Sequence, residues 1–216
     1  WDGVSSHVLV LAGVLPLLPG LTLTTALTEV ATKHLTSGTA RLTSAGLIFV
    51  QLAFGVALGA RLGSYFAVAG PPDAVALGWW VEFACLVVSS VAYAVLFSAL
   101  RRDYGWIALV GIIAYFAARF GSDRFGPELG AFIGAFAVGA TSNLFATVMN
   151  RPATILSVPG ILLLVPGSIG FRGVASLLEQ DADAGVNLAF SAILTAIALV
   201  AGLLLANTVV RPRKML

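Results

Sequence analysis

The sequence is poor in charged residues. Only 10% of its 216 residues are Asp, Glu, Lys or Arg, against about 25% in a typical soluble domain. The mean hydropathy is +0.99, and 59% of the residues are hydrophobic. So few charges cannot cover a water-facing surface, and the net charge of +2 gives no basic patch for nucleic acid.

Other signals are missing as well. The single cysteine, Cys85, excludes a disulfide framework. The sequence contains no His-Glu-x-x-His, Walker or Gly-x-Ser-x-Gly pattern, so we expect neither an enzyme nor a cofactor. It begins at Trp1 without a basic signal region, so we expect an upstream stretch to be absent from it.

The apolar residues form long runs, which indicate an all-α integral membrane protein of about seven spanning or half-spanning helices. A spanning helix needs about 20 apolar residues. Two of the runs are too short for a plain span, and both end at Pro-Gly. The seven runs are Val8–Leu18, Ala40–Ala60, Val75–Leu100, Ile107–Phe120, Leu129–Met149, Ile155–Val165 and Val186–Val210.

The basic residues predict the orientation. If every run crosses, eight Lys and Arg residues lie on one side and four on the other. The positive-inside rule then places the first side, with the C-terminus, in the cytoplasm of a cell-membrane protein. The eight are Lys33, Arg41, Arg101, Arg102, Arg151, Arg211, Arg213 and Lys214, and the four are Arg61, Arg119, Arg124 and Arg172.

An internal repeat is visible at an offset of 147 residues. The segment Gly13–Gly20 resembles Gly160–Gly167, and the same offset aligns Gly38 with Gly185 and Gly55 with Gly202. The two copies start five segments apart, so they should lie in opposite orientations, as in many secondary transporters. We therefore divide the chain into residues 1–62, the last two spans of a first repeat, and 63–216, a second five-span repeat.

Several motifs resemble the threonine/serine exporter family. They include Leu18-Pro19-Gly20 followed by Thr24-Thr25 and Glu29, then Ser37-Gly38, and in the second half Arg151-Pro152, Pro159-Gly160 and Val165-Pro166-Gly167-Ser168. The resemblance implies a ten-span domain of five plus five helices. It also implies proton-driven export of small polar solutes such as threonine and serine.

The partners implied by the resemblance are the lipid bilayer, a small polar solute and protons. A missing N-terminal half, or a small partner subunit, is a further expected partner. The alternatives are a membrane subunit of a two-chain dicarboxylate (succinate) exporter and a passive channel. An intramembrane enzyme is a weaker alternative, because the one acidic residue in a long apolar run has no evident mate.

The Pro-Gly steps are the first candidate sites. A half-length segment of about 11 residues covers roughly 16 Å, so Pro19-Gly20 and Pro166-Gly167 are expected to meet near mid-membrane and line one cavity. The alternative is an ordinary helix end at the interface. The hydroxyl groups that follow can either cap the next helix or contact solute; they belong to Thr22, Thr24, Thr25 and Ser168.

Two carboxylates are candidates for proton coupling. Glu29 lies on the polar face of Leu21–Thr36, and either has that role or forms a surface pair with Lys33, four residues further on. Glu82 lies within a long apolar run, where a carboxylate is expensive and by default a functional hypothesis. The preceding Trp79-Trp80 favour the alternative, in which Glu82 lies at headgroup depth.

The remaining polar and small residues have structural interpretations. We expect interhelical hydrogen bonds from Asn143, Asn150 and Asn207. Asp181 and Asp183 are expected in a solvated loop rather than at a metal. Close helix packing is predicted at glycines spaced every four residues, which are Gly55, Gly59 and Gly63, and Gly126, Gly130 and Gly134.

Overall fold

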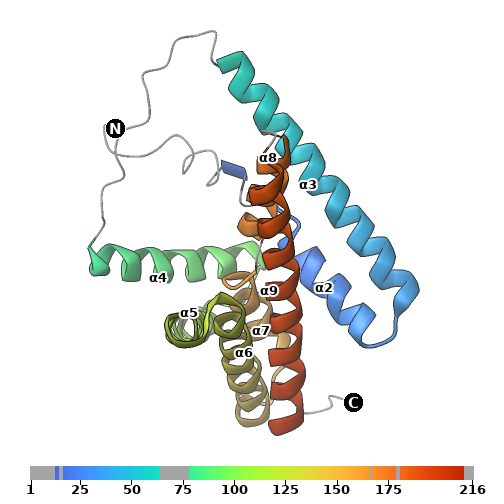
Figure 1. Ribbon diagram of the computed structural model, residues 1–216. Helices are drawn as coiled ribbons and strands as arrows, with labels where there is room; N and C mark the ends of the chain where they lie inside the picture. Colours follow the sequence, from blue (N-terminus) through green and yellow to red (C-terminus); the bar gives the residue numbers. More distant parts are fainter. Residues whose placement is uncertain (1–12, 15–16, 64–77, 166, 179–180, 212–216) are drawn as a thin grey trace. The chain divides into compact units, whose positions relative to one another are not determined.

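The chain is helical throughout the residues that the structure describes. The computed structural model covers residues 13–14, 17–63, 78–165, 167–178 and 181–211, and no strand occurs within these ranges (Figure 1). The predicted all-α fold is therefore confirmed. The main helices are α2 Gly20–Ala31, α3 Leu35–Gly63, α4 Trp79–Leu96, α5 Tyr104–Phe125, α6 Pro127–Met149, α7 Thr154–Leu162, α8 Gly167–Leu178 and α9 Ala182–Val209.

Five helical stretches in this part of the chain are long and apolar enough to cross a bilayer. They are Leu35–Gly59, Arg101–Phe125, Pro127–Met149, Thr154–Leu177 and Ala182–Val209, and the shorter Trp80–Leu96 is also apolar. Each of the five begins earlier than, or close to, the corresponding run in the sequence, because polar residues continue these helices beyond the apolar core. Most of the predicted run Val8–Leu18 lies outside the described residues.

Large apolar side chains remain exposed on the outside of these helices. Phe54 of α3, Val88 of α4, Phe116 of α5 and Ile197 of α9 each expose half or more of their surface. A water-soluble protein rarely exposes so many large apolar residues in contiguous patches. In a multi-span protein these surfaces contact lipid.

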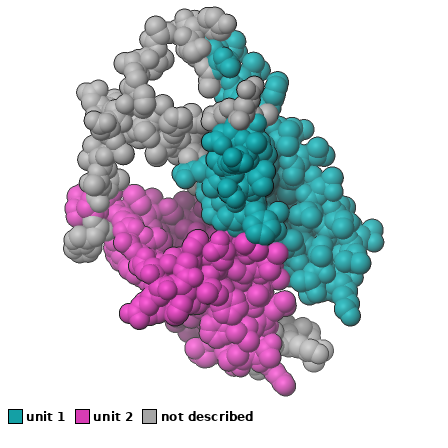
Figure 2. All heavy atoms as spheres, in the orientation of Figure 1, with its two compact units in different colours: residues 1–77, 166–193 teal, residues 78–165, 194–216 magenta. Residues whose placement is uncertain are grey.

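The chain divides into two compact units (Figure 2). Unit 1 contains residues 1–77 and 166–193, hence α2, α3, α8 and the start of α9. Glycine allows close packing within it. A Cβ atom at Gly38 would lie 2.6 Å from Val30 Cγ2, and one at Gly170 would lie 3.2 Å from the Phe49 ring. The α2–α3 hairpin and the α3–α8 contact therefore both need a glycine, because any side chain at Gly38 or Gly170 would enter the contact.

Unit 2 contains residues 78–165 and 194–216, hence α4 to α7 and the rest of α9. Its buried core includes Ile107, Val138 and Leu156. Gly126, with φ +94°, ends α5 and precedes α6, whose first residue is Pro127. Only glycine adopts this backbone geometry readily, and proline suits the first helical position, so the sharp α5–α6 turn follows from this dipeptide.

The glycine predictions have mixed outcomes. A Cβ at Gly130 would lie 2.6 Å from the Ala118 carbonyl oxygen, and one at Gly134 would lie 2.9 Å from Ala118 Cβ, so both pack as predicted. Gly126 serves the turn instead. For Gly55 and Gly59 the prediction is wrong among the described residues, since a Cβ at either position meets no atom within 4 Å.

Candidate functional site

In each of the two Pro-Gly motifs, the glycine is the first residue of a helix. Helix α2 starts at Gly20 directly after Pro19, and α8 starts at Gly167. Both glycines are buried in unit 1. A Cβ atom at Gly167 would lie 3.6 Å from Gly20 Cα and 3.4 Å from Leu18 Cβ. The two glycines therefore lie against each other, while their depth in the membrane and a cavity between them stay predictions. Pro166 lies outside the described residues, and solute binding at this contact stays a prediction.

The helix bounds in the two copies coincide at the offset read from the sequence. Helices α2 and α8 each contain 12 residues, and adding 147 to Gly20 and to Leu35 gives Gly167 and Ala182, the first residues of α8 and α9. The tight contacts also coincide. Gly38 packs on Val30, and the equivalent Gly185 would place a Cβ 2.5 Å from Leu177 Cγ, at the position equivalent to Val30.

The threonine hydroxyls of α2 do not cap the helix. Thr24 donates to the Gly20 carbonyl oxygen at 3.1 Å, and Thr25 donates to the Leu21 carbonyl oxygen at 2.7 Å. The N-cap residue of α2 is Pro19, whose side chain makes no capping hydrogen bond. The capping interpretation of Thr24 and Thr25 is thus wrong, because both lie one turn inside the helix. Their oxygen lone pairs remain available as acceptors.

Thr22 and Ser168 lie close to the two helix starts. Thr22 is in the first turn of α2, and Ser168 is the second residue of α8. Both are half-buried. This places one hydroxyl group from each copy within a turn of the Gly20–Gly167 contact.

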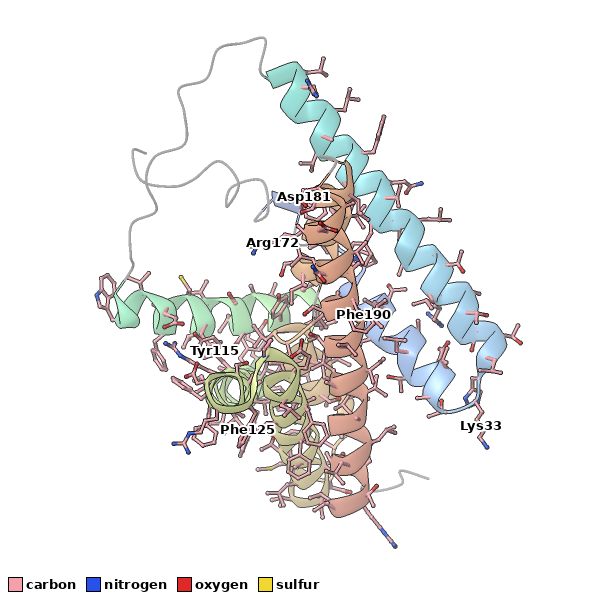
Figure 3. The ribbon with its side chains drawn as sticks, viewed as in Figure 1. Lys33, Tyr115, Phe125, Arg172, Asp181 and Phe190 are labelled. Atoms are coloured by element: carbon pink, nitrogen blue, oxygen red, sulfur yellow. The ribbon has the colours of Figure 1, made fainter. Side chains whose placement is uncertain are left out.

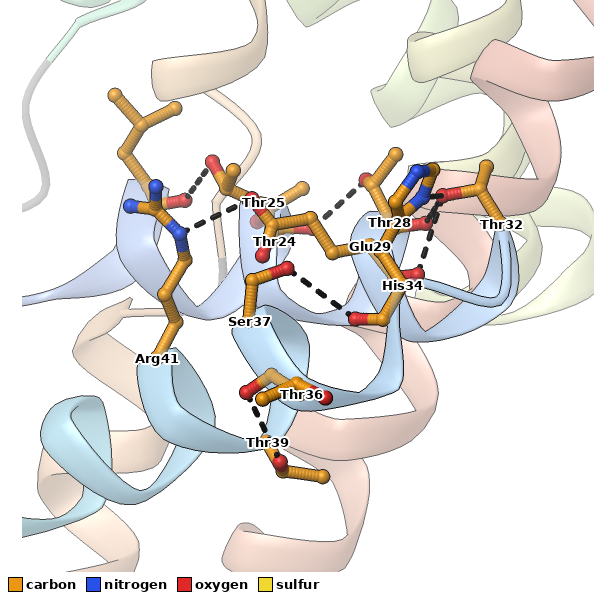
Figure 4. A network of polar contacts seen from close by, with 11 residues as sticks. Thr24, Thr25, Thr28, Glu29, Thr32, His34, Thr36, Ser37, Thr39 and Arg41 are labelled. Atoms are coloured by element: carbon orange, nitrogen blue, oxygen red, sulfur yellow. Dashed lines mark hydrogen bonds and ion pairs between the residues drawn. The ribbon is translucent and has the colours of Figure 1, made fainter.

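Glu29 pairs with a different base from the one expected. The turn after α2 removes Lys33 from the polar face, because Lys33 has φ 68° and lies at the tip of the α2–α3 connection (Figure 3). Instead Arg41 of α3 reaches back to α2, and its Nε lies 3.0 Å from Glu29 Oε1 (Figure 4). The predicted Glu29–Lys33 pair is therefore replaced by an ion pair between two helices.

The ion pair with Arg41 uses one of the two carboxylate oxygens of Glu29. Glu29 Oε2 is buried and has no hydrogen-bond partner among the described residues, and the side chain as a whole is 23% exposed. Figure 4 shows Thr25 and Ser37 beside the Glu29–Arg41 pair. A buried acceptor without a donor is costly, so this oxygen is available to accept a hydrogen bond from an ammonium or hydroxyl group.

Glu82 also has partners that the sequence did not suggest. It lies in the first turn of α4, and Arg119 Nη1 of α5 lies 2.8 Å from each of its carboxylate oxygens. The Tyr115 hydroxyl donates to Glu82 Oε1, and Tyr115 lies on α5 where that helix faces α4 (Figure 3). The Glu82 side chain is 45% exposed. Helices α4 and α5 contact each other, which brings Glu82 within reach of both side chains.

The asparagine predictions are confirmed for one pair. Asn143 Nδ2 of α6 donates to Asn207 Oδ1 of α9 at 2.8 Å and to the Val210 carbonyl oxygen at 2.8 Å. Asn150, with φ 56° and ψ 45°, instead ends α6 in the left-handed conformation that asparagine tolerates. For Asn150 the expected interhelical role is replaced by helix termination.

Asp181 and Asp183 stabilise the N-terminus of α9. Asp181 Oδ1 accepts from the Ala184 backbone N–H at 3.1 Å, which caps the N-terminus of α9. Asp183 lies in the first turn, where a negative charge is favourable. Within the described ranges no group of three His, Cys, Asp or Glu residues could hold a metal ion.

The sequence patterns did not predict the ion pair between Asp103 and Arg151. Asp103 is the last residue of the short 3-10 helix Arg101–Asp103, and its side chain is 2% exposed. Arg151 Nη1 donates to its Oδ1, and the Arg151 side chain is 20% exposed. The two residues are 48 positions apart and lie in loops at the ends of α5 and α6, where no helical periodicity links them.

Several long apolar helices with outward apolar surfaces define a polytopic α-helical membrane protein. Two family models identify it further. The model for the threonine/serine exporter, ThrE, matches residues 82–209, and a second threonine/serine exporter model matches residues 2–63. The chain belongs to the threonine/serine exporter family. No curated protein and no solved structure matches it.

Proposed function

We propose that this protein is a secondary transporter that exports threonine, serine or a similar small polar solute, driven by protons. The observation that carries the proposal is the contact between Gly20 and Gly167, at the starts of two helices of equal length. Helices interrupted at matching positions of two repeats mark the binding region in secondary transporters. Family membership supports the same class.

The opposite orientation of the two repeats is part of this proposal. The matching helix bounds support a duplication, and the odd number of segments between the copies gives the inversion. In this arrangement residues 1–62 end the first repeat and residues 63–216 form the second. The two compact units do not follow that division, because unit 1 takes α8 from the second copy.

The residues proposed to contact solute lie around the two breaks. The free N–H groups at the starts of α2 and α8 carry partial positive charge and suit the carboxylate of an amino acid. Hydroxyl groups from both copies add polar contacts. The proposed solute site consists of Pro19, Gly20, Thr22, Thr25, Glu29, Pro166, Gly167 and Ser168.

Proton coupling is assigned to Glu29 and Glu82. Glu29 is supported by its unpartnered buried oxygen, because a neutral carboxyl group costs less to bury than a carboxylate. Glu82 is held by Arg119 and Tyr115, so its protonation would release Arg119. We place the protein in the cell membrane with the C-terminus in the cytoplasm, from the bias of basic residues.

Counterflow into proteoliposomes tests the proposal. Vesicles loaded with unlabelled L-threonine should accumulate labelled L-threonine in a saturable manner, and an imposed pH gradient should drive net movement. Gly167→Trp should abolish counterflow, because an indole cannot fit against Leu18 and Gly20. Gly46→Trp is the matched control, since a Cβ at Gly46 meets no atom within 4 Å.

The same vesicles separate the alternatives. Unsaturable flux of threonine without counterflow indicates a channel. Saturable exchange of succinate in place of threonine indicates a dicarboxylate exporter. Activity that appears only after adding a second membrane protein indicates a two-chain exporter.

A further inference from the structure

Unit 2 contains a cavity whose wall includes the Asp103–Arg151 pair. The cavity has a volume of about 380 Å³, within the ~300–1,000 Å³ of typical small-molecule pockets. It lies where the α4–α5 loop meets the α6–α7 loop, and Pro159 of α7 closes one side. None of its lining residues belongs to the proposed solute site around the Pro-Gly breaks.

The charged pair is unusual in its burial. Taking two charges out of water costs several kcal/mol per ion, and such pairs often add little to stability. The Asp103 side chain is almost wholly buried, whereas Arg151 keeps a fifth of its side chain accessible. A guanidinium group has five N–H donors, and the bond to Asp103 uses one Nη1 donor. The guanidinium can therefore hold Asp103 and still present donors to the cavity that it lines.

Two hydroxyl groups complete the polar part of the wall. Ser98 lies in the loop after α4, and Thr154 is the first residue of α7. The start of α7 carries no side-chain cap, since its N-cap residue is Ala153. The rest of the lining includes Phe97, Leu100 and Ile155, which are apolar. The cavity thus places one cation, one anion and two hydroxyl groups against an apolar background.

We infer that this cavity is a second binding site, which takes the zwitterion of a small hydroxy amino acid. The carboxylate of the ligand binds the Arg151 guanidinium, and its ammonium group binds the Asp103 carboxylate. The bond between the two side chains is exchanged for two bonds to the ligand, so no charge is left unpaired. Ser98 and Thr154 face the hydroxyl group of the ligand. A dicarboxylate is disfavoured, because its second carboxylate meets Asp103.

The position of the cavity gives the site a role that rests on the proposed function. Arg101, Arg102 and Arg151 are among the basic residues that assign this side of the protein to the cytoplasm. An exporter receives its solute from the cytoplasm. The site is therefore a loading site, which selects zwitterions before transport.

Ligand analogues paired with variants test the site. Binding to the purified full chain is measured by calorimetry for L-threonine, L-threonine amide, which lacks the carboxylate, and N-acetyl-L-threonine, which lacks the ammonium group. Each analogue should bind the unmodified protein about tenfold or more weakly, the typical loss of a charged hydrogen bond. In Asp103→Asn the penalty for N-acetyl-L-threonine should disappear while the amide penalty remains. In Arg151→Gln the pattern should reverse.

A purely structural pair gives a different result. If both variants fold and each discriminates the two analogues as the unmodified protein does, the inference is overturned. If either single variant fails to fold, Thr154→Val and Ser98→Ala keep the pair and should weaken threonine binding severalfold without changing alanine binding. Thr147→Val, on the exposed part of α6 outside the cavity, is the control, and equal effects in all three overturn the inference.

The outcome is separable from that of the proposed function. If the unmodified protein exchanges neither threonine nor serine in vesicles, the proposed function fails. If it exchanges them and the Asp103 and Arg151 variants keep normal analogue discrimination, only the loading site fails.

Discussion

Two equivalent glycines in the repeat face different environments, and their substitution by alanine should therefore have different effects. Gly202 of α9 lies against α6 in unit 2, where a Cβ atom would lie 2.4 Å from the Phe132 carbonyl oxygen and 3.0 Å from Ala135 Cβ. Gly55 of α3 is the equivalent position, and a Cβ there meets no atom within 4 Å. Both glycines lie in the interior of a long apolar helix.

The expected magnitudes follow from these distances. Replacing glycine by alanine within a helix gains about 1 kcal/mol of helix propensity, and this gain applies equally to both positions. At Gly202 the new methyl group contacts backbone, which cannot rotate away, so the two helices must separate. Overpacking of this kind costs about 1–3 kcal/mol. We therefore expect Gly202→Ala to be less stable than Gly55→Ala by about 1–3 kcal/mol.

Unfolding in mixed micelles measures the difference. Each purified variant is titrated with SDS, and helix content is followed by circular dichroism. Gly55→Ala should match or exceed the unmodified protein, whereas Gly202→Ala should unfold at lower SDS. Equal stability of the two variants would refute the reasoning. If both are destabilised, the Gly55 face is packed as tightly as the Gly202 face in the protein in solution.

Three further outcomes are expected. Glu82→Gln should uncouple threonine export from an imposed pH gradient in vesicles, and unchanged pH dependence would return Glu82 to a structural pair with Arg119. Asn143→Leu should lower stability in the SDS assay by about 1 kcal/mol, because the bond to α9 is lost; an unaltered midpoint would show that this bond contributes nothing. A reporter fused after Leu216 should be active in the cytoplasm, and an external reading would contradict the orientation.

The elements that sequence patterns predicted well depend on local backbone chemistry. Pro-Gly cannot continue a helix and readily starts a new one, so the positions of α2 and α8 follow from Pro19-Gly20 and from Gly167. The Asn143–Asn207 bond was also foreseeable, because a polar amide inside an apolar helix needs a partner on another helix.

The partners of charged residues could not be predicted in the same way. Helical spacing favoured Lys33 for Glu29, but the α2–α3 turn moved Lys33 away and brought Arg41 into reach. Periodicity describes one helix, whereas these pairs join two. The pair of Glu82 and Arg119 likewise joins two helices, α4 and α5, so the spacing within either helix does not predict it. Helical spacing does not link Asp103 to Arg151 either, since Asp103 lies in the short 3-10 helix between α4 and α5.

The two copies of the repeat share their framework but differ in their polar residues. The first residues of the helices coincide at the 147-residue offset, and so do the contacts of Gly38 and Gly185, whereas those of Gly55 and Gly202 differ. At that same offset Glu29 corresponds to Ser176, Arg41 to Leu188 and Thr25 to Arg172. The helix starts at Gly20 and Gly167 therefore correspond, whereas the residues of the Glu29–Arg41 pair occur in one copy alone. In the proposed transporter, the frame that both copies share would open to either side of the membrane, and the single Glu29–Arg41 pair would let one copy respond to protons.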